Sequence, residues 1–561
     1  MEDSYTDFAM EILHSIVHAI MGRKDIRLII VSGRQDESDD MENREHLYKL
    51  TYNSIYRINA MCSFDGLIFT QPEFVGVSDD LFMDVPKVYI ASDKKDEITV
   101  NYDNEMGIRE AIDYLVRVKG FTRICMIGGR DDCADARIRK EIFRKCLEEN
   151  GISYSEKLYV KADMSPDTQG PAAALLAMNP DVQAIFCVND PTAMGLYDVM
   201  RAKGLIPGKD IAVFGFDNAN IAGEMIPPLA SIGTDGVTLG KRALEVLLEM
   251  IAGEKVTSQV VPTRLYGRES LEYEMYEFTA QDMLSGGEGF IYGFFDNCFY
   301  RYRNEIVDSK DINLKRLFYE IISRMLYALK NRYMSQEQFN EISRMIDILF
   351  ENGVMRYTDA SRFVRSIARL QSNMNETHRS GYVVSRNNRL FSHMKDRAIL
   401  SQAFRHTMET REYNFGRGRI FDFTIETVNY GTPDPGAMER LIGNFDKAGF
   451  DNAAMYLYDK PVLYDGTDPE PLPELMYLKC VVRDKTLYVI PEERQECPVD
   501  RIYTRSVIPR AQKGYISFPL FYGRYLFGVL VACVTRALID NGEYVSSQVS
   551  RMIYLNWCGK E

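Results

Sequence analysis

The stretch from Ala184 to Arg268 constrains the fold more than any other part of the chain. The apolar run 184–188 precedes a helix that starts near Ala193, and the apolar run 211–214 follows a glycine- and proline-containing turn at 204–208. Short continuous apolar runs between helices are typical of buried parallel strands. The stretch therefore predicts an α/β fold built on a doubly wound parallel sheet.

Polar residues follow these predicted strands directly. Asn189 and Asp190 come after the first strand, and Asp217 comes after the second. In an open doubly wound sheet, ligands bind just beyond the carboxyl ends of the strands. We therefore expect these side chains at a site for a polar ligand. Thr70, at the end of an earlier predicted strand over 65–70, is a further possible ligand contact.

Four ordered motifs extend this pattern: VNYDNEMGIREAIDYLVRVKGFTRICMIGG, NDPTAMGLYDVMRAKGLIPGKDIAVFGFDN, PPLASIGTDGVTLGKRALEVLLEMIAG and VVPTRLYGRES. In order and spacing they resemble the effector-binding region of LacI/GalR-type repressor proteins, over roughly residues 5 to 271. The resemblance implies a two-lobed, type I periplasmic-binding-protein-like fold that closes on its ligand by hinge motion. It also implies a role in the regulation of transcription.

The resemblance implies three further ligand contacts. Asp103 stands where the family's effector site uses an aspartate, although an acidic residue at a helix start can also simply cap backbone N–H groups. Arg139 precedes Phe143 by four residues, as in the family, but Ile142 replaces the expected glycine. Its planar guanidinium suits paired hydroxyls or a carboxylate, although a surface arginine on a helix is usually only solvated. Met164 replaces an aromatic that stacks on sugars in many relatives, so pure sugar stacking is less expected.

Two parts of the family pattern do not precede the helix predicted over 7–21: a first strand and a DNA-binding helix-turn-helix. The strand would lie centrally in the sheet, so its loss would leave backbone groups unpaired. We expect a truncated sequence or a misassigned start in preference to a true loss. Without a recognition helix, and with a net charge of -14, the chain alone is not expected to bind DNA directly.

The composition restricts the setting of the protein. Its ten cysteines are scattered without a CxxC pair, which favours a reduced, cytoplasmic location. The sequence contains no apolar run long enough for a membrane span, and its start lacks the features of a secretion signal. It also shows no catalytic constellation, no metal-binding motif and no cofactor motif, so we expect a protein that is not an enzyme.

Residues 276–410 are predicted to form a helical connector. Leu314, Leu317, Ile321 and Met325 share one helix face, and Ser335 with the glutamine at 338 forms a capping-box signature. The apolar face could pair with a second subunit, which would make the protein a homodimer. The alternative is an ordinary packed helical domain within one chain.

Residues 411–561 mix helices and strands. The pattern predicts a helix over 438–450, strands over 453–458, 474–482 and 486–490, a hairpin over 514–534 and a closing helix over 544–557. The run FPLFYGRYLFGVLVACV and this order of elements resemble a GAF-type regulatory domain.

These features predict a cytoplasmic ligand-sensing regulatory protein, with a sensor over residues 1–275. The alternatives are the sensory half of a signalling enzyme, such as a diguanylate cyclase whose output domain is absent, and a transport component, which the missing secretion signal disfavours. Asp103, Arg139, Asn189 and Asp217 suit a neutral sugar or nucleoside-like ligand, because two aspartates repel an anion whereas hydroxyls donate to them. We expect Arg139 and Asp217 to be hydrated in an open, unliganded cleft.

Overall fold

The structure is a computed structural model that describes most of the 561 residues. The described residues are 7–20, 23–34, 44–70, 77, 79–234, 237–271, 278–299, 302, 313–377, 381–428, 445, 450–463, 471–504 and 514–558. The chain divides into two compact units. Unit 1 comprises Met1–Val100, Gly240–Gln259 and Thr410–Glu561, and unit 2 comprises Asn101–Leu239 and Val260–Glu409.

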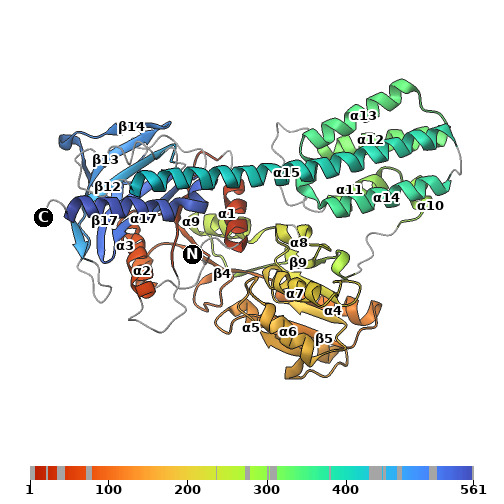
Figure 1. The fold of residues 1–561 in the computed structure, drawn as a ribbon, viewed down its shortest axis with the longest axis horizontal. Coiled ribbons are helices and arrows are strands. Elements are labelled where there is room, and N and C mark those ends of the chain that lie inside the picture. The colour runs from red at the N-terminus through yellow and green to blue at the C-terminus, as the bar shows by residue number, and fades with distance from the viewer. Residues whose placement is uncertain are drawn as a thin grey trace. The chain divides into compact units, whose positions relative to one another are not determined.

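Unit 2 contains a six-stranded sheet, coloured orange to yellow-green in Figure 1. Its strands are β5 (Ile124–Gly128), β6 (Tyr159–Lys161), β7 (Ala184–Cys187), β8 (Ala212–Phe216), β9 (Ala230–Thr234) and β11 (Thr263–Tyr266), in the order β11-β9-β8-β7-β5-β6. All neighbouring strands are parallel except β11, which runs antiparallel to β9. The predicted parallel sheet is confirmed for this lobe.

Helices cover both faces of this sheet. They are α4 (Asn104–Asp113), α5 (Ala134–Glu149), α6 (Gln169–Met178), α7 (Asp190–Ala202) and the short α8 (Asn220–Glu224). The apolar residues of α6 and α7 share one core with alternate residues of β5, β7 and β8. On the opposite face, Phe143 of α5 packs against Phe186 of β7, with ring centroids 6.3 Å apart. The alternation of strand side chains between two covered faces explains why the strands read as continuous apolar runs.

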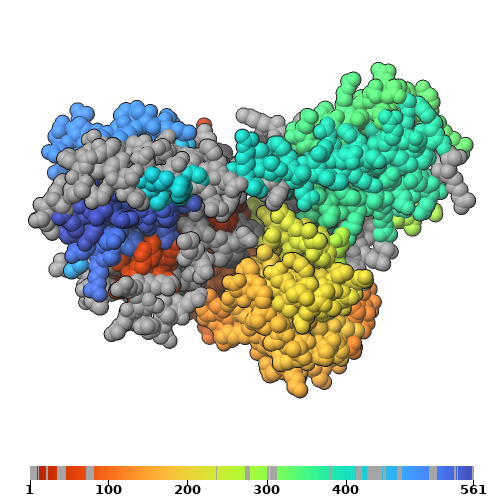
Figure 2. Space-filling model, in the orientation of Figure 1, coloured from red at the N-terminus to blue at the C-terminus, as the bar shows by residue number. Residues whose placement is uncertain are grey.

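Unit 2 also contains a helical bundle, whose atoms are coloured green to cyan in Figure 2. Its helices are α10 (Ala280–Ser285), α11 (Gly287–Cys298), α12 (Leu314–Asn331), α13 (Gln336–Glu351), α14 (Ala360–Thr377) and the first part of α15 (Tyr382–Val428). The capping box predicted at Ser335 is present at the start of α13. The last of these helices, α15, is 47 residues long and extends beyond the predicted end of the connector at residue 410.

The apolar stripe on α12 lies inside this bundle. Leu314, Ile321 and Met325 are 4%, 0% and 0% exposed, and Leu317 packs against the same core. Because other helices of the same chain cover the stripe, the expectation that it pairs with a second subunit is wrong. The alternative, a helical domain packed within one chain, describes these residues.

Unit 1 contains two sheets. The smaller has the order β10-β4-β3-β2, with β2 (Leu67–Phe69), β3 (Lys87–Ile90), β4 (Ile98–Tyr102) and β10 (Gln259–Val261). The strands β2, β3 and β4 are parallel. Two further helices of this unit, α1 (Asp7–Ala19) and α9 (Leu239–Ile251), touch where Gly240 lies against the backbone of Ile12.

The larger sheet of unit 1 is formed mainly by the C-terminal part of the chain. Its strands are β12 (Ala453–Leu463), β13 (Leu475–Arg483), β14 (Thr486–Val489), β15 (Glu496–Pro498), β16 (Tyr515–Tyr522), β17 (Tyr525–Cys533) and β1 (Ile29–Val31). The order is β1-β16-β17-β12-β13-β14, with β15 paired to β13. The predicted hairpin is confirmed as β16 and β17, and α17 (Arg536–Cys558) contains the predicted closing helix. The helix predicted over 438–450 falls almost entirely outside the described residues.

An N-terminal segment completes this C-terminal sheet. The strand β1 pairs in parallel with β16, with Ile29 opposite Tyr515. The helices α2 (Arg44–Tyr52) and α3 (Ser54–Ala60) contribute to one core of the sheet, and α17 contributes to the other. Asn53 separates α2 from α3, and its side chain exchanges two hydrogen bonds with the backbone of Arg34. Residues 29–60, which the sequence places in the sensor, therefore pack with the last domain.

None of the described helices is long and apolar enough to cross a membrane.

Candidate functional site

Arg139 is the centre of the candidate site in unit 2. It lies on the apolar face of α5, in line with the buried Ala136, Phe143 and Cys146. Its side chain is only 2% exposed. A buried charge is costly unless its hydrogen-bonding groups are satisfied. The position of Arg139 on this face therefore requires partners within the lobe, and the expectation of a hydrated side chain is wrong.

The partners of Arg139 come from separate strand–helix junctions. Its Nε donates to Asn104 Oδ1 at 2.9 Å, and its Nη1 donates to the carbonyl oxygen of Val188 at 2.7 Å. The guanidinium carbon lies 3.6 Å from the centroid of the Phe216 ring, a stacked cation–π arrangement. The ring of Tyr102 meets that of Phe216 edge-on, with centroids 5.4 Å apart. These contacts fix the plane of the guanidinium.

Two carboxylates approach the remaining nitrogen of Arg139. Nη2 lies 3.5 Å from Asp217 Oδ1 and 3.7 Å from Asp135 Oδ2. Asp135 also accepts a hydrogen bond from Asn104 Nδ2 at 2.8 Å. Both separations from Nη2 are long for charge-assisted hydrogen bonds. The two carboxylates are therefore attracted to Arg139 but are not engaged by it at close range.

Asp217 is held in an unusual environment. Burial raises the pKa of its carboxyl group, the positive charge of Arg139 opposes this rise, and Asp135 adds to it. Its backbone φ is 94° and that of Asn218 is 51°, so two consecutive residues other than glycine occupy the left-handed region. Asp217 N donates to Ile232 O, and Asn218 N donates to Ser231 Oγ. Hydrogen bonds from β9 thus hold this backbone in place.

Asn189 and Asp103 both cap helices. Asn189 Oδ1 accepts from the backbone N–H of Thr192 at 3.0 Å, and its Nδ2 donates to Met164 O at 2.9 Å. Asp103 Oδ1 accepts from the backbone N–H of Met106 at 3.0 Å at the start of α4. The capping interpretation weighed for Asp103 describes its observed contact. A ligand-binding role for either side chain stays a prediction.

Asp190 points into the lobe. It is fully buried, and its carboxylate accepts from Ser231 Oγ at 2.6 Å and from Ala219 N at 2.8 Å. Burial and the neighbouring Asp217 raise the pKa of Asp190 well above its ordinary value. A Cβ atom at position 215 would lie 2.2 Å from Asp190 Oδ1, so Gly215 makes room for this carboxylate. The expectation that Asp190 faces a ligand is not met, since its contacts tie β7, β8 and β9 together.

Met164 and Thr70 are the remaining predicted contacts. Met164 has a φ of 69°, and its side chain lies close to Gly129, where an added Cβ would be 2.7 Å from the sulfur. Its carbonyl joins it to Asn189, as described above. Thr70 follows β2 in unit 1 and is half-buried. Its part in the site stays a prediction.

The sequence did not identify Asn104, Asp135 or Phe216 as site residues. Asn104 directly follows the predicted Asp103, and Phe216 directly precedes Asp217. In each case the sequence identified the right position in the chain, but did not predict that the neighbouring side chain contacts Arg139. Asp135 lies four residues before Arg139 on the same helix face, a spacing that places charged side chains together. That spacing was the signal in the sequence from which Asp135 could have been predicted.

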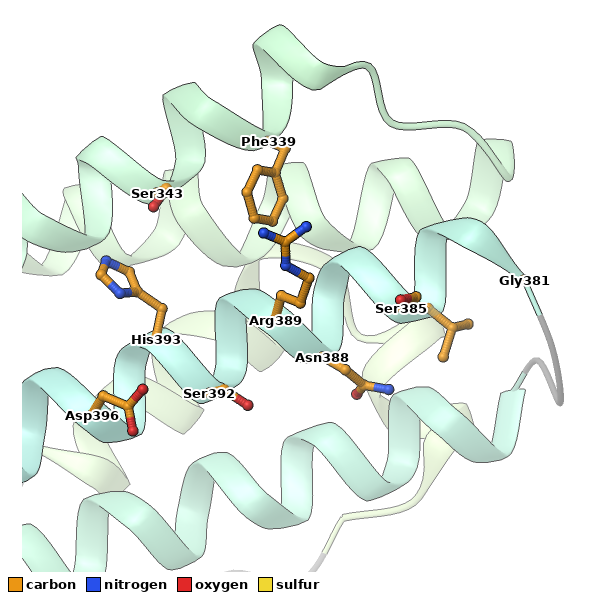
Figure 3. A pocket seen from close by; sticks show the side chains of 10 residues that line it. Phe339, Ser343, Gly381, Ser385, Asn388, Arg389, Ser392, His393 and Asp396 are labelled. Atoms are coloured by element: carbon orange, nitrogen blue, oxygen red, sulfur yellow. The ribbon is translucent and has the colours of Figure 1, made fainter.

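A separate hollow lies in the helical bundle. It has a volume of about 770 Å³ and lies between α13 and α15, with Phe339, Ser343, Arg389 and His393 among its lining residues (Figure 3). The guanidinium of Arg389 lies 4.9 Å from the centroid of the Phe339 ring, and His393 Nε2 lies 2.9 Å from Asp347 Oδ1. Its lining residues all belong to the bundle and none to the strand ends that carry the Arg139 cluster, and none of the charged residues that line it is buried. It is therefore the weaker candidate for a ligand site.

Comparison with known proteins supports the assignment of the lobe. The family model described as "Periplasmic binding protein-like domain" matches residues 112–271. The HTH-type transcriptional repressor PurR of Vibrio atlanticus is 32% identical over 215 residues, which cover 37% of this chain and 62% of PurR. The HTH-type transcriptional regulator CelR of Thermobifida fusca is 33% identical over 175 residues, covering 30% of this chain and 51% of CelR. The chain thus spans half to two thirds of the length of these curated relatives.

Among solved structures, the transcriptional regulator CelR–cellobiose complex superposes with a TM-score of 0.40 and 25% sequence identity, over 47% of this chain and 79% of that chain. The matched residues 112–271 include Arg139 and Asp217, and they contain all six strands of the lobe. Over these residues, the chain matches a periplasmic-binding-protein-like domain.

Proposed function

We propose that this chain is a cytoplasmic ligand-sensing regulatory protein that acts in transcriptional regulation. The observation that carries the proposal is the cluster around Arg139, in which a buried guanidinium and two loosely engaged carboxylates meet at the ends of parallel strands. This is where open α/β sheets bind ligands. The relatives PurR and CelR, both regulators of transcription by name, support the regulatory part of the proposal.

The ligand that we propose is a neutral polyhydroxylated molecule, a sugar or a nucleoside. Asp135 and Asp217 give the cluster two negative charges against the single positive charge of Arg139, which disfavours an anionic ligand. Hydroxyl groups can donate to both carboxylates, and their oxygens can accept from Arg139 Nη2. A ligand placed there would make short hydrogen bonds in place of the long separations of 3.5 and 3.7 Å.

The C-terminal sheet of unit 1 is proposed to be a GAF-like regulatory domain, and the helical bundle a connector. The proposal rests on the hairpin β16–β17, on the antiparallel neighbours β12 and β13, and on the closing helix α17. The helix α15 begins in the bundle and extends to Val428. We propose no direct DNA contact by this chain alone, because its net charge of -14 opposes approach to phosphates.

We also propose that the protein is a homodimer. The residues proposed to form the interface are not those of the α12 stripe but lie on α15. The helix α15 exposes the large apolar side chains Leu400, Phe404, Phe421 and Ile425, which are 60%, 67%, 65% and 44% exposed. Leu400 and Phe421 are three heptads apart, as are Phe404 and Ile425. Leu400 and Phe404 are four positions apart, as are Phe421 and Ile425, a spacing of successive seam positions in a coiled coil, and the seam positions between these two pairs are Thr407, Arg411, Asn414 and Gly418. A second copy of α15 is the partner we propose for the four apolar side chains.

Thermal unfolding of the full chain with and without D-ribose, cellobiose, adenosine or guanosine tests the ligand proposal. At least one compound should raise the melting temperature, since a ligand that binds only the folded state stabilises it by mass action. Asp217→Asn should remove that response while leaving a folded protein. The matched control is Arg144→Lys on the same helix, whose guanidinium is 49% exposed and pairs with Glu141. An absence of stabilisation by all four compounds, or a normal response in the Asp217 variant, would contradict the proposed site.

A further inference from the structure

A second buried arginine joins the lobe to the helical bundle within unit 2. Arg268 follows β11, and its side chain is 1% exposed. Its Nη1 donates to Leu229 O at 2.9 Å, its Nη2 donates to Asn218 Oδ1 at 2.7 Å, and its Nε donates to Asp359 Oδ2 at 2.9 Å. Two of these acceptors belong to the lobe, and the third belongs to the bundle. Arg268 is therefore a fixed contact between the two parts of the unit.

Asp359 lies at the start of α14, and its side chain is 5% exposed. Its carbonyl oxygen accepts from the N–H of Phe363 at 2.9 Å in the first turn of that helix. Phe363 is fully buried among the aromatic side chains of the bundle core. A Cβ atom at position 223 would lie 2.1 Å from Asp359 Oδ1, so Gly223 of the lobe makes room for this carboxylate. The first turn of α14 is thus held against the lobe by a buried ion pair.

The candidate ligand site is one residue away from this contact. Asp217 faces Arg139 at 3.5 Å, and its neighbour Asn218 accepts from Arg268 at 2.7 Å. Both residues have positive φ, in a conformation that persists only where the surrounding contacts hold it. A displacement of the Asp217 carboxylate larger than rotation of its side chain allows would move the adjoining backbone, and with it the amide that Arg268 contacts.

We propose that Asp217, Asn218, Arg268 and Asp359 couple the occupancy of the Arg139 site to the first turn of α14. The inference rests on the proposed function, because it assigns a route by which ligand binding reaches the bundle. A ligand that engages Asp217 more tightly than Arg139 does would bias the Asp217–Asn218 backbone between two arrangements. A ligand shifts such an equilibrium only through its different affinities for the two arrangements. Arg268 and Asp359 act as positioning residues that transmit this difference.

Hydrogen exchange measured by mass spectrometry on the full chain tests the coupling. Asp217→Asn removes a charge at the site, and among the described residues Asp217 makes no hydrogen bond or ion pair with the bundle. Its expected effect is a change of about fivefold in the exchange of amides 360–366, the lower end of common coupling strengths. Amides of α6 and α12 serve as internal references. An unchanged rate at 360–366, or the same change in the reference helices, would overturn the inference.

A matched control and a reciprocal measurement complete the experiment. Glu269→Gln breaks the half-exposed ion pair between Glu269 and Arg365, in which the nitrogen and oxygen atoms are 3.1 Å apart. This pair also joins the lobe to the bundle. This variant should leave the exchange of 360–366 unchanged. Because coupling is reciprocal, Asp359→Asn should alter the affinity for whichever of the four compounds stabilises the wild type. If none stabilises it, the proposed function fails, while the exchange effect of Asp217→Asn still decides the coupling.

Discussion

At the residue scale, the buried contacts of Arg139 predict that its replacement lowers the stability of the unliganded protein. Arg139→Ala would leave Asn104 Oδ1 and the Val188 carbonyl without their donor, and Asp135 and Asp217 without their counter-charge. Breaking a buried charged network typically costs about 3 kcal/mol. We therefore expect the unliganded variant to lose roughly that much unfolding free energy, measured by urea denaturation. Arg144→Ala, on the exposed face, should change it by less than about 0.5 kcal/mol. Equal stabilities would mean that the partners of Arg139 are satisfied by water.

The buried carboxyl group of Asp190 predicts how the stability of the protein depends on pH. Burial and Asp217 raise its pKa well above the ordinary value, so the protonated form is favoured by folding. The resulting stabilisation is complete below the unfolded pKa of about 4 and is lost as the pH rises through the folded pKa. Asp190→Asn keeps the shape without ionising. The unfolding free energy of this variant relative to wild type should therefore increase as the pH rises from 4 to 8. A difference that stays constant or decreases would contradict the raised pKa.

At the scale of elements, substitution of Asn189 distinguishes a role in capping α7 from a role in binding the ligand. It caps α7 through the N–H of Thr192 and also accepts from the Thr192 hydroxyl at 2.6 Å. Loss of such a cap costs about 1 kcal/mol. Asn189→Ala should lower the unfolding free energy by that amount, and Asn189→Asp should restore most of it because a carboxylate also caps. If both variants are as stable as wild type, the cap is unimportant and the predicted ligand role gains weight.

The elements also show how far the sequence determines the structure. The apolar runs at 184–187 and 212–216 predicted their strands, because strands covered on both faces need apolar residues throughout. The same kind of run at Ile29–Val31 did not reveal its sheet, since three apolar residues fit either sheet of unit 1. The sequence predicted the apolar stripe on α12. It did not predict that other helices of the same chain cover the stripe, because those helices are distant in the sequence. In the site, the sequence identified the strand ends but not the directions of adjacent side chains, such as Asp103 and Asn104.

At the scale of the whole molecule, the exposed face of α15 predicts self-association. Phe404→Glu together with Phe421→Glu places charges on two side chains that are 67% and 65% exposed. If a second copy covers them, sedimentation velocity at tens of micromolar should show a dimer for wild type and a monomer for the double variant. Tyr327→Glu on α12 is the control, because Tyr327 is also 67% exposed but lies outside this face. A monomeric wild type, or a double variant that still dimerises, would remove α15 as the interface.

The pairing of β1 with β16 has a consequence for biosynthesis. Ile29 lies opposite Tyr515, so the two partners are 515 minus 29, or 486, positions apart. Ribosomes add about 5–20 residues each second, which separates the emergence of the two strands by roughly half a minute or more. During that interval Ile55 and Ile58 of α3, both fully buried in the finished fold, lack the C-terminal strands of the core that they share. The nascent chain therefore presents an apolar N-terminal segment to cellular chaperones until its last strands leave the ribosome.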